Sequence, residues 1–413
     1  MLKRIKIGDL IKQKKAHSQT GPFGTQLKAS DYVEQGIPVI NVRNIGFGEI
    51  RENQLEYLDD EMATILKSHR LIKNDIVFGR KGAVERHSLI SSNEEGWIQG
   101  SDCIRLRFLN SEYNPTFVSY FFRTEQHKQW MINLGSFGAT MGSLNQDIIS
   151  KIEIPNLLLP FQNKIASILS SYDALIKNNN QRIKLLEEMA EEIYEEWFVR
   201  LRFPGYENTK IVDGMPQGWE KMKLNNVLEP VKRKPKISTD KYLSEGKYPI
   251  IDQGDDFIAG YTNDENLVQF APLPLLVFGD HTRRVKFVNY PFASGADGTQ
   301  LLSPKNKSLL PIYFYISIKN IDLSNFHYAR HFKFLKQEYI LIPDDDTLLL
   351  FNNLTSPFFE EIQILKEKNQ LLQETRDLLL PRLISGKLSV VHLIEKEVEE
   401  ELMMVAEQSA EYK

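Results

Sequence analysis

The sequence predicts an α+β protein in which two similar mixed globular domains are separated by two long antiparallel helices, with internal pseudo-twofold symmetry. Two observations predict this fold class. Short motifs in the first half of the 413-residue chain recur in the same order in the second half. Two later segments carry seam residues at alternating steps of four and three over several heptads. At about 150 residues per domain, the length accommodates both domains and both helices.

Five motif pairs define the internal repeat, and a repeat organises the whole fold. The pairs are IPVINV (37–42) with YPIIDQ (248–253), DIVFGRKG (75–82) with LLVFGDHT (275–282), DCIRL (102–106) with DGTQL (297–301), KIEIP (151–155) with EYILIP (338–343), and LLEEM (185–189) with LLQET (371–375). The order is kept while the spacing falls steadily, as it would if the second copy had shorter loops. The alternative is that short β-strands resemble one another by chance.

Each copy follows the same plan of strands, a short helix and a long helix. Apolar runs such as 38–40 and 275–278, broken by Gly and Asn, predict strands. A helical segment at 117–122 has its partner at 312–318. The predicted parts are a first domain at 1–158, a central long helix at 159–203, a second domain at 204–354, a second long helix at 355–388 and an acidic tail at 389–413.

The first long helix has a heptad seam. Its seam residues are Ile165, Leu169, Tyr172, Ile176, Asn179, Ile183, Leu186, Ala190, Ile193 and Trp197. Pro160 suits a first helical turn, and Pro204 followed by Gly205 ends the segment. A straight helix from Pro160 to Phe198 would be roughly 58 Å long. This length favours a rigid spacer between the two domains over packing inside one domain.

The second long helix repeats the seam and predicts how the two helices pair. Its seam residues are Phe358, Ile362, Leu365, Asn369, Leu372, Arg376, Leu379 and Leu383. We expect Pro381 to kink or end this helix and Gly386 to cap it. One Asn in each seam, Asn179 and Asn369, is a helix-register residue. Antiparallel packing about a pseudo-twofold near residue 181 would bring the two together; the alternative places one or both at a solvated rim.

Composition excludes several classes of protein. The net charge of −4 arises in the tail, where the residues from Lys387 include three basic and seven acidic side chains, so the rest of the chain is balanced. No apolar run approaches the ~18 residues of a membrane helix. Cys103 is the single cysteine, which excludes an internal disulfide or a multi-cysteine zinc site. We therefore expect a cytoplasmic protein that does not associate with membranes.

Basic clusters beside predicted strands indicate a reader of two separated DNA half-sites, because spaced modules mirror the spacing of their sites. Arg, Lys, Asn and Gln are the side chains that contact phosphates and base edges. The candidates in the first domain are Arg43, Asn44, Arg80, Lys81, Arg86 and His87. Those in the second are Gln253, His281, Thr282, Arg283, Arg284 and Lys286, together with Arg330, His331 and Lys333, which are equivalent to residues 138–143 of the first copy. Each cation could instead be an ordinary surface charge.

Motifs for catalysis are missing from the sequence. It contains no G-x-x-x-x-G-K-[ST] phosphate loop and no H-E-x-x-H metal motif. The segment Asn114-Pro115-Thr116-Phe117 resembles an adenine methyltransferase motif but lacks its second proline, so we interpret it as a strand-to-helix junction. Asp344, Asp345 and Asp346 follow Pro343 and are interpreted as a solvated turn. We predict no catalytic residue, no metal site and no cofactor for this chain.

Four stretches carry a resemblance to a known family. They are the central segment at 152–199, LRFPG (201–205), MPQGWE (215–220) and LLLPRLISGKL (378–388). With them, the chain resembles a type I restriction-modification specificity subunit over essentially its whole length. The resemblance implies two target-recognition domains, each reading half of an asymmetric bipartite site in double-stranded DNA. It also implies that the helices set the spacer and dock two methyltransferase subunits, which use S-adenosylmethionine, and that restriction subunits join them.

Two alternatives remain open at this point. One is a self-contained DNA methyltransferase or nuclease with undetected motifs, and the other is a coiled-coil scaffold that does not bind DNA. Methyl transfer by the isolated chain would favour the first, and a failure to bind DNA would favour the second.

Overall fold

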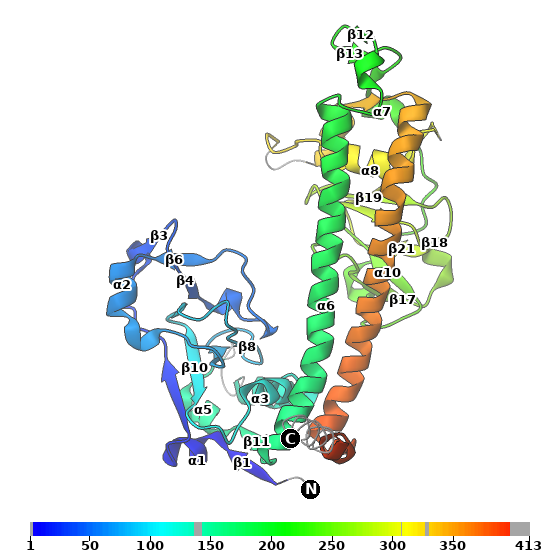
Figure 1. The fold of residues 1–413 in the computed structure, drawn as a ribbon. Coiled ribbons are helices and arrows are strands. Elements are labelled where there is room, and N and C mark those ends of the chain that lie inside the picture. The colour runs from blue at the N-terminus through cyan, green and yellow to red at the C-terminus, as the bar shows by residue number, and fades with distance from the viewer. Residues whose placement is uncertain (1–2, 136–142, 307, 327–329, 397–413) are drawn as a thin grey trace, which may run out of the picture. The chain divides into compact units, whose positions relative to one another are not determined.

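The computed structural model describes residues 3–135, 143–306, 308–326 and 330–396 (Figure 1). They form two compact units. Unit 1 comprises the described residues of Met1–Asn178 and Lys368–Lys413, and unit 2 comprises those of Asn179–Glu367. Most of the predicted acidic tail, and most of the predicted loop at 138–143, lie outside the described residues.

Unit 1 contains a five-stranded sheet in the order β2-β10-β7-β8-β5, a four-stranded sheet in the order β3-β6-β4-β9, and the antiparallel pair β1-β11. The strands are β1 (Arg4–Lys6), β2 (Ala16–Thr20), β3 (Tyr32–Val33), β4 (Ile37–Ile40), β5 (Phe47–Gly48), β6 (Glu56–Leu58), β7 (Ile76–Gly79), β8 (His87–Leu89), β9 (Ile98–Gln99), β10 (Cys103–Phe108) and β11 (Glu153–Pro155). Strand β7 is buried along its whole length, so the loop that follows it starts from a rigid sheet.

The side chains of Asp59, Asn114 and Asn145 each cap the start of a helix in unit 1. They are α1 (Ile7–Lys12), α2 (Asp60–Ile65), α3 (Pro115–Phe122), α4 (Glu125–Gly135) and α5 (Gln146–Lys151), with the short turns η1 (Ala29–Asp31), η2 (Val42–Asn44) and η3 (Lys67–His69). The Asn114 side chain accepts hydrogen bonds from the N–H groups of Thr116 and Phe117, and Pro115 fills the first helical position. The Asn-Pro-Thr-Phe motif is therefore the cap of α3, as its interpretation as a structural junction predicts.

Unit 2 repeats this architecture with sheets in the orders β15-β22-β19-β20 and β17-β16-β21-β18 and with the pairs β14-β23 and β12-β13. The strands are β12 (Ile211–Val212), β13 (Met215–Pro216), β14 (Glu220–Lys223), β15 (Leu228–Glu229), β16 (Tyr248–Ile251), β17 (Gly260–Thr262), β18 (Val268–Gln269), β19 (Leu275–Gly279), β20 (Val285–Val288), β21 (Phe292–Ser294), β22 (Thr299–Pro304) and β23 (Tyr339–Ile342). The helices are α7 (Leu224–Val227), α8 (Pro311–Lys319) and α9 (His331–Leu335), with the turns η5 (Tyr206–Asn208), η6 (Thr239–Lys241) and η7 (Glu265–Leu267).

Strand pairing confirms the internal repeat and corrects one of its alignments. β4 pairs antiparallel with β6 and parallel with β9, and β16 likewise pairs antiparallel with β17 and parallel with β21, which supports the alignment of 37–42 with 248–253. Cys103 lies opposite Gly79, whereas Thr299 lies opposite Gly279. Asp102 therefore corresponds to Gly298, one residue later than the motif match suggested. Short apolar strands tolerate such a slip in a sequence comparison.

The repeat also begins earlier than the motif pairs indicated. β1 leads directly into α1, and β14 leads directly into α7. In both units the first helical N–H donates to the residue before the partner strand: Ile7 donates to the Ile152 carbonyl at 2.9 Å, and Leu224 donates to the Glu338 carbonyl at 2.8 Å. The segments RIKIGDLI and KMKLNNVL carry this similarity in the sequence, but they are too short to stand out.

The long helices are α6 (Leu159–Tyr194), continued by the π-helical turn η4 (Glu195–Val199), and α10 (Asp345–Ile384), shown green and orange in Figure 1. The solvated turn predicted at 344–346 is wrong, because Asp344 accepts a hydrogen bond from the Thr347 N–H and caps α10. Pro381 does not end α10. Gly386, with φ of +71°, follows its last turn as predicted. No described helix combines the length and apolarity that crossing a bilayer requires.

Within each unit the two long helices run antiparallel. In unit 1 Asp173 of α6 lies 2.6 Å from Arg376 of α10, and in unit 2 Arg182 of α6 lies 2.7 Å from Glu361 of α10. All predicted seam residues of both helices are buried or half-buried. Asn179 and Asn369 are each only 8 % exposed, which excludes a solvated rim. Because Asn179 belongs to unit 2 and Asn369 to unit 1, their pairing stays a prediction.

Asp173 is the centre of a charged cluster that joins α3, α6 and α10 inside unit 1. Its carboxylate accepts hydrogen bonds from the Tyr120 hydroxyl at 2.6 Å, from Arg123 at 2.8 Å and from Arg376 at 2.6 Å. Although burial disfavours the charged carboxylate, the Arg123 charge and these hydrogen bonds hold the pKa of Asp173 below its usual value. The ionised carboxylate therefore stabilises the attachment of α3 to both long helices.

We predict that Asp173→Asn lowers the free energy of unfolding at pH 7 by about 1–3 kcal/mol, because charged hydrogen bonds to Arg123 and Arg376 are lost. Since the folded pKa is lowered, this contribution is complete above the unfolded pKa of about 3.9 and is lost as the pH falls through the folded pKa. Urea denaturation at neutral and acidic pH measures the difference between variant and wild type. The exposed Asp60→Asn serves as the control, and a difference that persists unchanged into strong acid would contradict the prediction.

Candidate nucleic-acid interface

The predicted recognition loop of unit 1 spans residues 80–86 between β7 and β8, and its frame is made by backbone groups. The Arg80 N–H donates to the Asp102 carbonyl at 2.8 Å, and the Arg80 carbonyl accepts from the Leu144 N–H at 2.8 Å. Backbone bonds to two separate segments fix where the loop leaves the sheet. The side chains in the loop can therefore vary without moving it.

The predicted loop of unit 2, residues 280–284 between β19 and β20, has the same frame. The Asp280 N–H donates to the Gly298 carbonyl, and the Asp280 carbonyl accepts from the His331 N–H, both at 2.8 Å. The Phe332 N–H also donates to the Asp280 carboxylate at 2.8 Å. The predicted candidates at 330–333 thus lie beside this loop, at the position that Leu144 occupies in unit 1.

One arginine occupies the same position in both loops. His87 begins β8 and Val285 begins β20, and each pairs with the equivalent phenylalanine of the neighbouring strand. Arg86 and Arg284, which precede them, are therefore structurally equivalent. The Arg86 guanidinium lies over the Phe47 ring, 5.6 Å from its centroid, so its plane is held by an aromatic surface.

Three predicted cations are exposed and rest against carboxylates that the sequence reasoning missed. Arg43, 44 % exposed, pairs with Glu56 at 2.7 Å. Lys81, 62 % exposed, pairs with Asp102 at 3.3 Å, and Arg284, 51 % exposed, pairs with Asp255 at 2.6 Å. Exposed pairs contribute only about 0–1 kcal/mol, so exchanging the carboxylate for a phosphate costs little. Of the three acidic partners, Asp102 was visible in the repeated DCIRL motif.

Asn44 supports the chain instead of facing solvent. Its side chain is fully buried, accepts a hydrogen bond from the Asn41 N–H at 3.0 Å, and donates to the carbonyls of Arg51 and Asn53 at 2.9 and 3.1 Å. Both the oxygen and the nitrogen of the Asn44 amide therefore form hydrogen bonds that stabilise the turn around η2. In this conformation the Asn44 side chain is used inside the fold, and its neighbour Arg43 is the exposed residue of the pair.

His87 is also a core residue. It has no exposed surface, its Nε2 lies 2.9 Å from the Ser119 hydroxyl, and its ring packs edge-on against Phe122 at 5.3 Å. Burial, followed by the nearby Arg123 charge, holds the pKa of His87 well below its usual value. The imidazole is therefore neutral at physiological pH and stabilises the fold of unit 1.

Gln253 and Thr282 connect the loops of unit 2 to each other. The Gln253 amide donates to the Asp297 carbonyl at 2.8 Å and accepts from the His281 N–H at 3.1 Å. The Thr282 hydroxyl donates to the Gln253 carbonyl at 2.7 Å. These bonds bring three segments that are distant in the sequence, around residues 253, 281–282 and 297, to one surface, where the side chains of His281 and Thr282 remain exposed.

The remaining candidates of unit 2 divide into buried and exposed side chains. Lys286 is buried and donates to the Asp256 carbonyl at 2.6 Å, and burial lowers its pKa. His331 is buried with its two ring nitrogens 2.9 Å from the carbonyls of Asp280 and Phe326. Lys286 and His331 are structural in this conformation. The exposed candidates are Arg283, Arg330 and Lys333, and Arg283 has a left-handed backbone with φ of +61° and donates to the Leu323 carbonyl.

Comparison with known proteins places the repeated fold and its paired loops in a family. The family model described as type I restriction modification DNA specificity domain matches residues 5–188 and 216–372. The chain belongs to this family. The two matched segments begin within β1 and at β13, so the family model follows the internal repeat.

Relatives within the specificity family support this assignment. The MjaIX specificity subunit, a type I restriction enzyme subunit of Methanocaldococcus jannaschii, is 25 % identical over 308 residues, covering 67 % of this chain and 70 % of the relative. A putative MjaX specificity subunit of the same organism is 25 % identical over 196 residues, covering 46 % of each chain. The crystal structure of a type I restriction-modification S subunit from M. genitalium shares the fold, with a TM-score of 0.55 and 16 % identity over 93 % of this chain and 96 % of that one.

We predict that His87 lowers the stability of the protein as the pH falls below about 6.5. At that pH the imidazole of the unfolded chain binds a proton, whereas the buried imidazole of the folded protein stays neutral because its pKa is lowered. The comparison is between wild type and His87→Phe, which keeps an aromatic ring but cannot titrate. Between pH 7.5 and 5, the free energy of unfolding of the wild type should fall relative to the variant by up to about 1.4 kcal/mol per pH unit. Denaturant titrations at each pH measure this difference, and a constant difference would contradict the prediction.

Proposed function

We propose that this chain is the DNA-recognition subunit of a type I restriction-modification complex and that each mixed domain reads one half of an asymmetric bipartite site. The observation that carries the proposal is the pair of equivalent loops, framed by the same backbone bonds and each presenting an arginine, Arg86 or Arg284. Exposed cations beside these loops suit phosphate contacts, and the two arginines suit base edges. Membership of a DNA specificity family supports this reading.

The two half-sites should differ in sequence because the two loops differ in side chains. The first loop carries Lys81 near its start, whereas the second carries His281 and Thr282. We assign target recognition to residues 1–158 and 204–354 and the spacer to the helices at 159–203 and 355–388.

We further propose that methylation and cleavage are performed by partner subunits in the cytoplasm and that this chain is not catalytic. The relatives are named as specificity subunits of type I restriction enzymes, which supports such an assembly. The long helices carry exposed apolar side chains suited to docking. Leu185 of α6 and Leu371 of α10, equivalent in the repeat, are 58 % and 63 % exposed. Two equivalent docking positions fit two methyltransferase subunits that bring S-adenosylmethionine with them.

The equivalent arginines should each control one half of the methylation motif. We predict that Arg284→Ala weakens binding of the cognate site by about 1–3 kcal/mol and relaxes one base position, because a bidentate contact to a base is lost. Arg86→Ala should have the same effect on the other half. Methylome sequencing of a host that carries the whole system, with each variant in turn, detects which half of a gapped motif changes.

Lys333→Ala is the matched control for a phosphate contact: it should lower affinity for all sequences and reduce the salt dependence without changing the motif. If Arg86→Ala and Arg284→Ala altered the same half of the motif, the assignment of one half-site to each domain would be wrong. Methyl transfer from labelled S-adenosylmethionine by the isolated chain would instead favour a self-contained methyltransferase.

Docking of the methyltransferase subunits should depend on the two exposed leucines. We predict that Leu185→Glu and Leu371→Glu each remove one methyltransferase copy from the assembly, because a charge would have to be buried at the contact. Native mass spectrometry of the co-expressed complex counts the copies. Gln373→Glu, an exposed position on another face of α10, introduces the same charge and should leave the assembly complete. Retention of both copies by the double leucine variant would contradict the docking assignment.

A further inference from the structure

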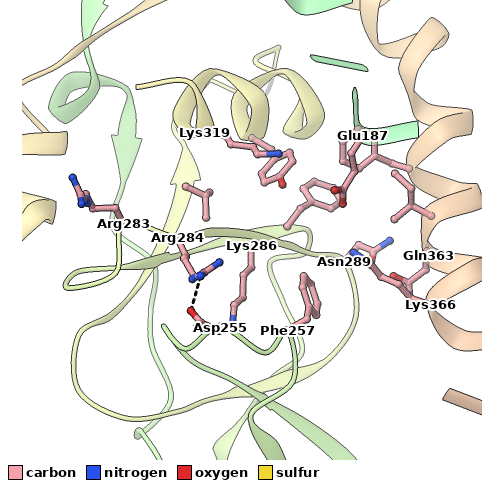
Figure 2. A pocket seen from close by; sticks show the side chains of 15 residues that line it. Glu187, Asp255, Phe257, Arg283, Arg284, Lys286, Asn289, Lys319, Gln363 and Lys366 are labelled. Carbon is pink, nitrogen blue, oxygen red and sulfur yellow. Dashed lines mark ion pairs between the residues drawn. The ribbon is translucent and has the colours of Figure 1, made fainter. Parts of the chain in front are cut away.

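A pocket of 380 Å³ lies within unit 2, between the β19–β20 hairpin, α8 and the parts of α6 and α10 that belong to this unit. Figure 2 shows Arg284 and Lys286 on one side of it and Gln363, Lys366 and Asn289 on the other. The volume is in the range of small-molecule sites. Of its lining residues, only those of the hairpin were predicted from the sequence to contact DNA.

Aromatic rings form a continuous surface in this pocket. The ring centroids of Phe287 and Phe359 are 5.4 Å apart, those of Phe287 and Tyr315 are 5.7 Å apart, and those of Tyr315 and Phe359 are 5.8 Å apart. A fourth ring, Phe257, also lines the pocket. The ring planes are inclined to one another by 57°, 65° and 84°, so the rings form an apolar corner in which a nucleobase can stack on one ring face and contact the edges of the others.

Cations surround the aromatic surface. The lining includes Arg283, Arg284, Lys286, Lys319 and Lys366, against the two carboxylates of Glu187 and Asp255. Most of these cations already have a partner, such as Asp255 for Arg284 and Glu191 for Lys319. Lys366 differs: among the described residues no carboxylate oxygen lies within 4.0 Å of its ammonium, which lies 4.4 Å from the centroid of the Phe257 ring.

Burial lowers the pKa of Lys366, with Glu187 opposing and Lys319 adding to the effect. A half-buried ammonium that meets an aromatic face but no carboxylate would gain from an incoming anion. Asn289 and Gln363 add amide groups to the lining, which can donate to and accept from the edge of a base. The chemistry required of a ligand is thus a planar ring with an attached anion.

The residues that line the pocket differ from those at the equivalent positions of unit 1. In unit 1 the positions equivalent to Lys319 and Phe359 are Arg123 and Asp173, which bond to each other at 2.8 Å in the charged cluster described above. There the junction between the mixed domain and the helices is closed by side chains. In unit 2 Phe359 takes the place of the carboxylate, Lys319 pairs with Glu191 instead, and both Phe359 and Lys319 line the pocket.

We propose that this pocket binds a nucleotide, with the base packed against Phe287, Tyr315 and Phe359 and the phosphate paired with Lys366. The same chemistry is offered by a free nucleotide and by a nucleotide of a bound DNA strand. Binding of a free nucleotide is independent of the function proposed above, whereas binding of a strand nucleotide rests on it.

The test uses the full chain, with Lys366→Gln to remove the charge and Phe257→Leu to remove the ring that holds the ammonium. Lys368→Gln, an exposed lysine on the same helix that does not line the pocket, is the matched control. Calorimetry with dAMP, adenosine and inorganic phosphate tests the free source, and fluorescence anisotropy with labelled duplex and single-stranded DNA tests the strand source. We expect both pocket variants to weaken binding about tenfold or more and the control to leave it unchanged.

The two arms give distinct outcomes. Binding of dAMP that is tighter than that of phosphate or adenosine, and is weakened by Lys366→Gln, supports the free source. A loss of DNA affinity in Lys366→Gln without dAMP binding supports the strand source. Equal behaviour of wild type and Lys366→Gln in both arms, or equal affinity for phosphate and dAMP, would overturn the proposal while leaving the roles of Arg86 and Arg284 untouched. If Lys366→Gln does not fold by circular dichroism, Gln363→Glu places a repelling charge in the pocket instead.

Discussion

The apolar seam of the two long helices is the constraint on which both units depend. A helix as long as α6, with 36 residues, needs its apolar face covered to persist in water. In unit 1, Leu169 of α6 and Leu383 of α10 share one hydrophobic core with Phe117 of α3. In unit 2, Ala190 and Phe351 share a core with Tyr313 of α8 in the same way. Each mixed domain is therefore built onto a helix pair, and the register of that pair decides where its recognition loop is held.

The parts of the fold that could be predicted from the sequence are those that produce a local periodic pattern of apolar residues. Heptad spacing and short apolar runs give the long helices, the strands and the repeat. The course of α10 could not be predicted in this way, because Pro381 locally favours a stop. A proline in a helix interior costs about 3 kcal/mol, and burying Leu380, Leu383 and Ile384 in the core outweighs it. Whether α10 continues past Pro381 is therefore decided by tertiary packing, which cannot be deduced from the local sequence pattern.

The candidate site was predictable as a pair of loops but not as individual contacts. Basic clusters after equivalent strands predicted two loops, and the structure places these loops at equivalent positions, between β7 and β8 and between β19 and β20. Their contact with DNA stays a prediction. The sequence could not separate Arg86 from His87, because successive strand residues face opposite sides of a sheet and the first residue of β8 is uncertain by one position. For the same reason the sequence predicted DNA contact for both the buried Lys286 and the exposed Arg284. The acidic partners of the exposed cations were missed because they come from other segments of the chain.

The frames of the two loops explain how one fold can carry two specificities. Arg80 and Asp280 have opposite charges, yet they occupy equivalent positions and make the same pair of backbone hydrogen bonds. Because N–H and C=O groups make the frame that both loops share, residues of different charge can occupy the same frame position, and unit 2 adds side-chain bonds from Asp280 and Thr282. The junction with the helices has diverged as freely, to a closed charged cluster around Asp173 in unit 1 and an open aromatic pocket in unit 2. Backbone bonding thus separates the position of each loop from its chemistry, which is what a reader of two unlike half-sites requires.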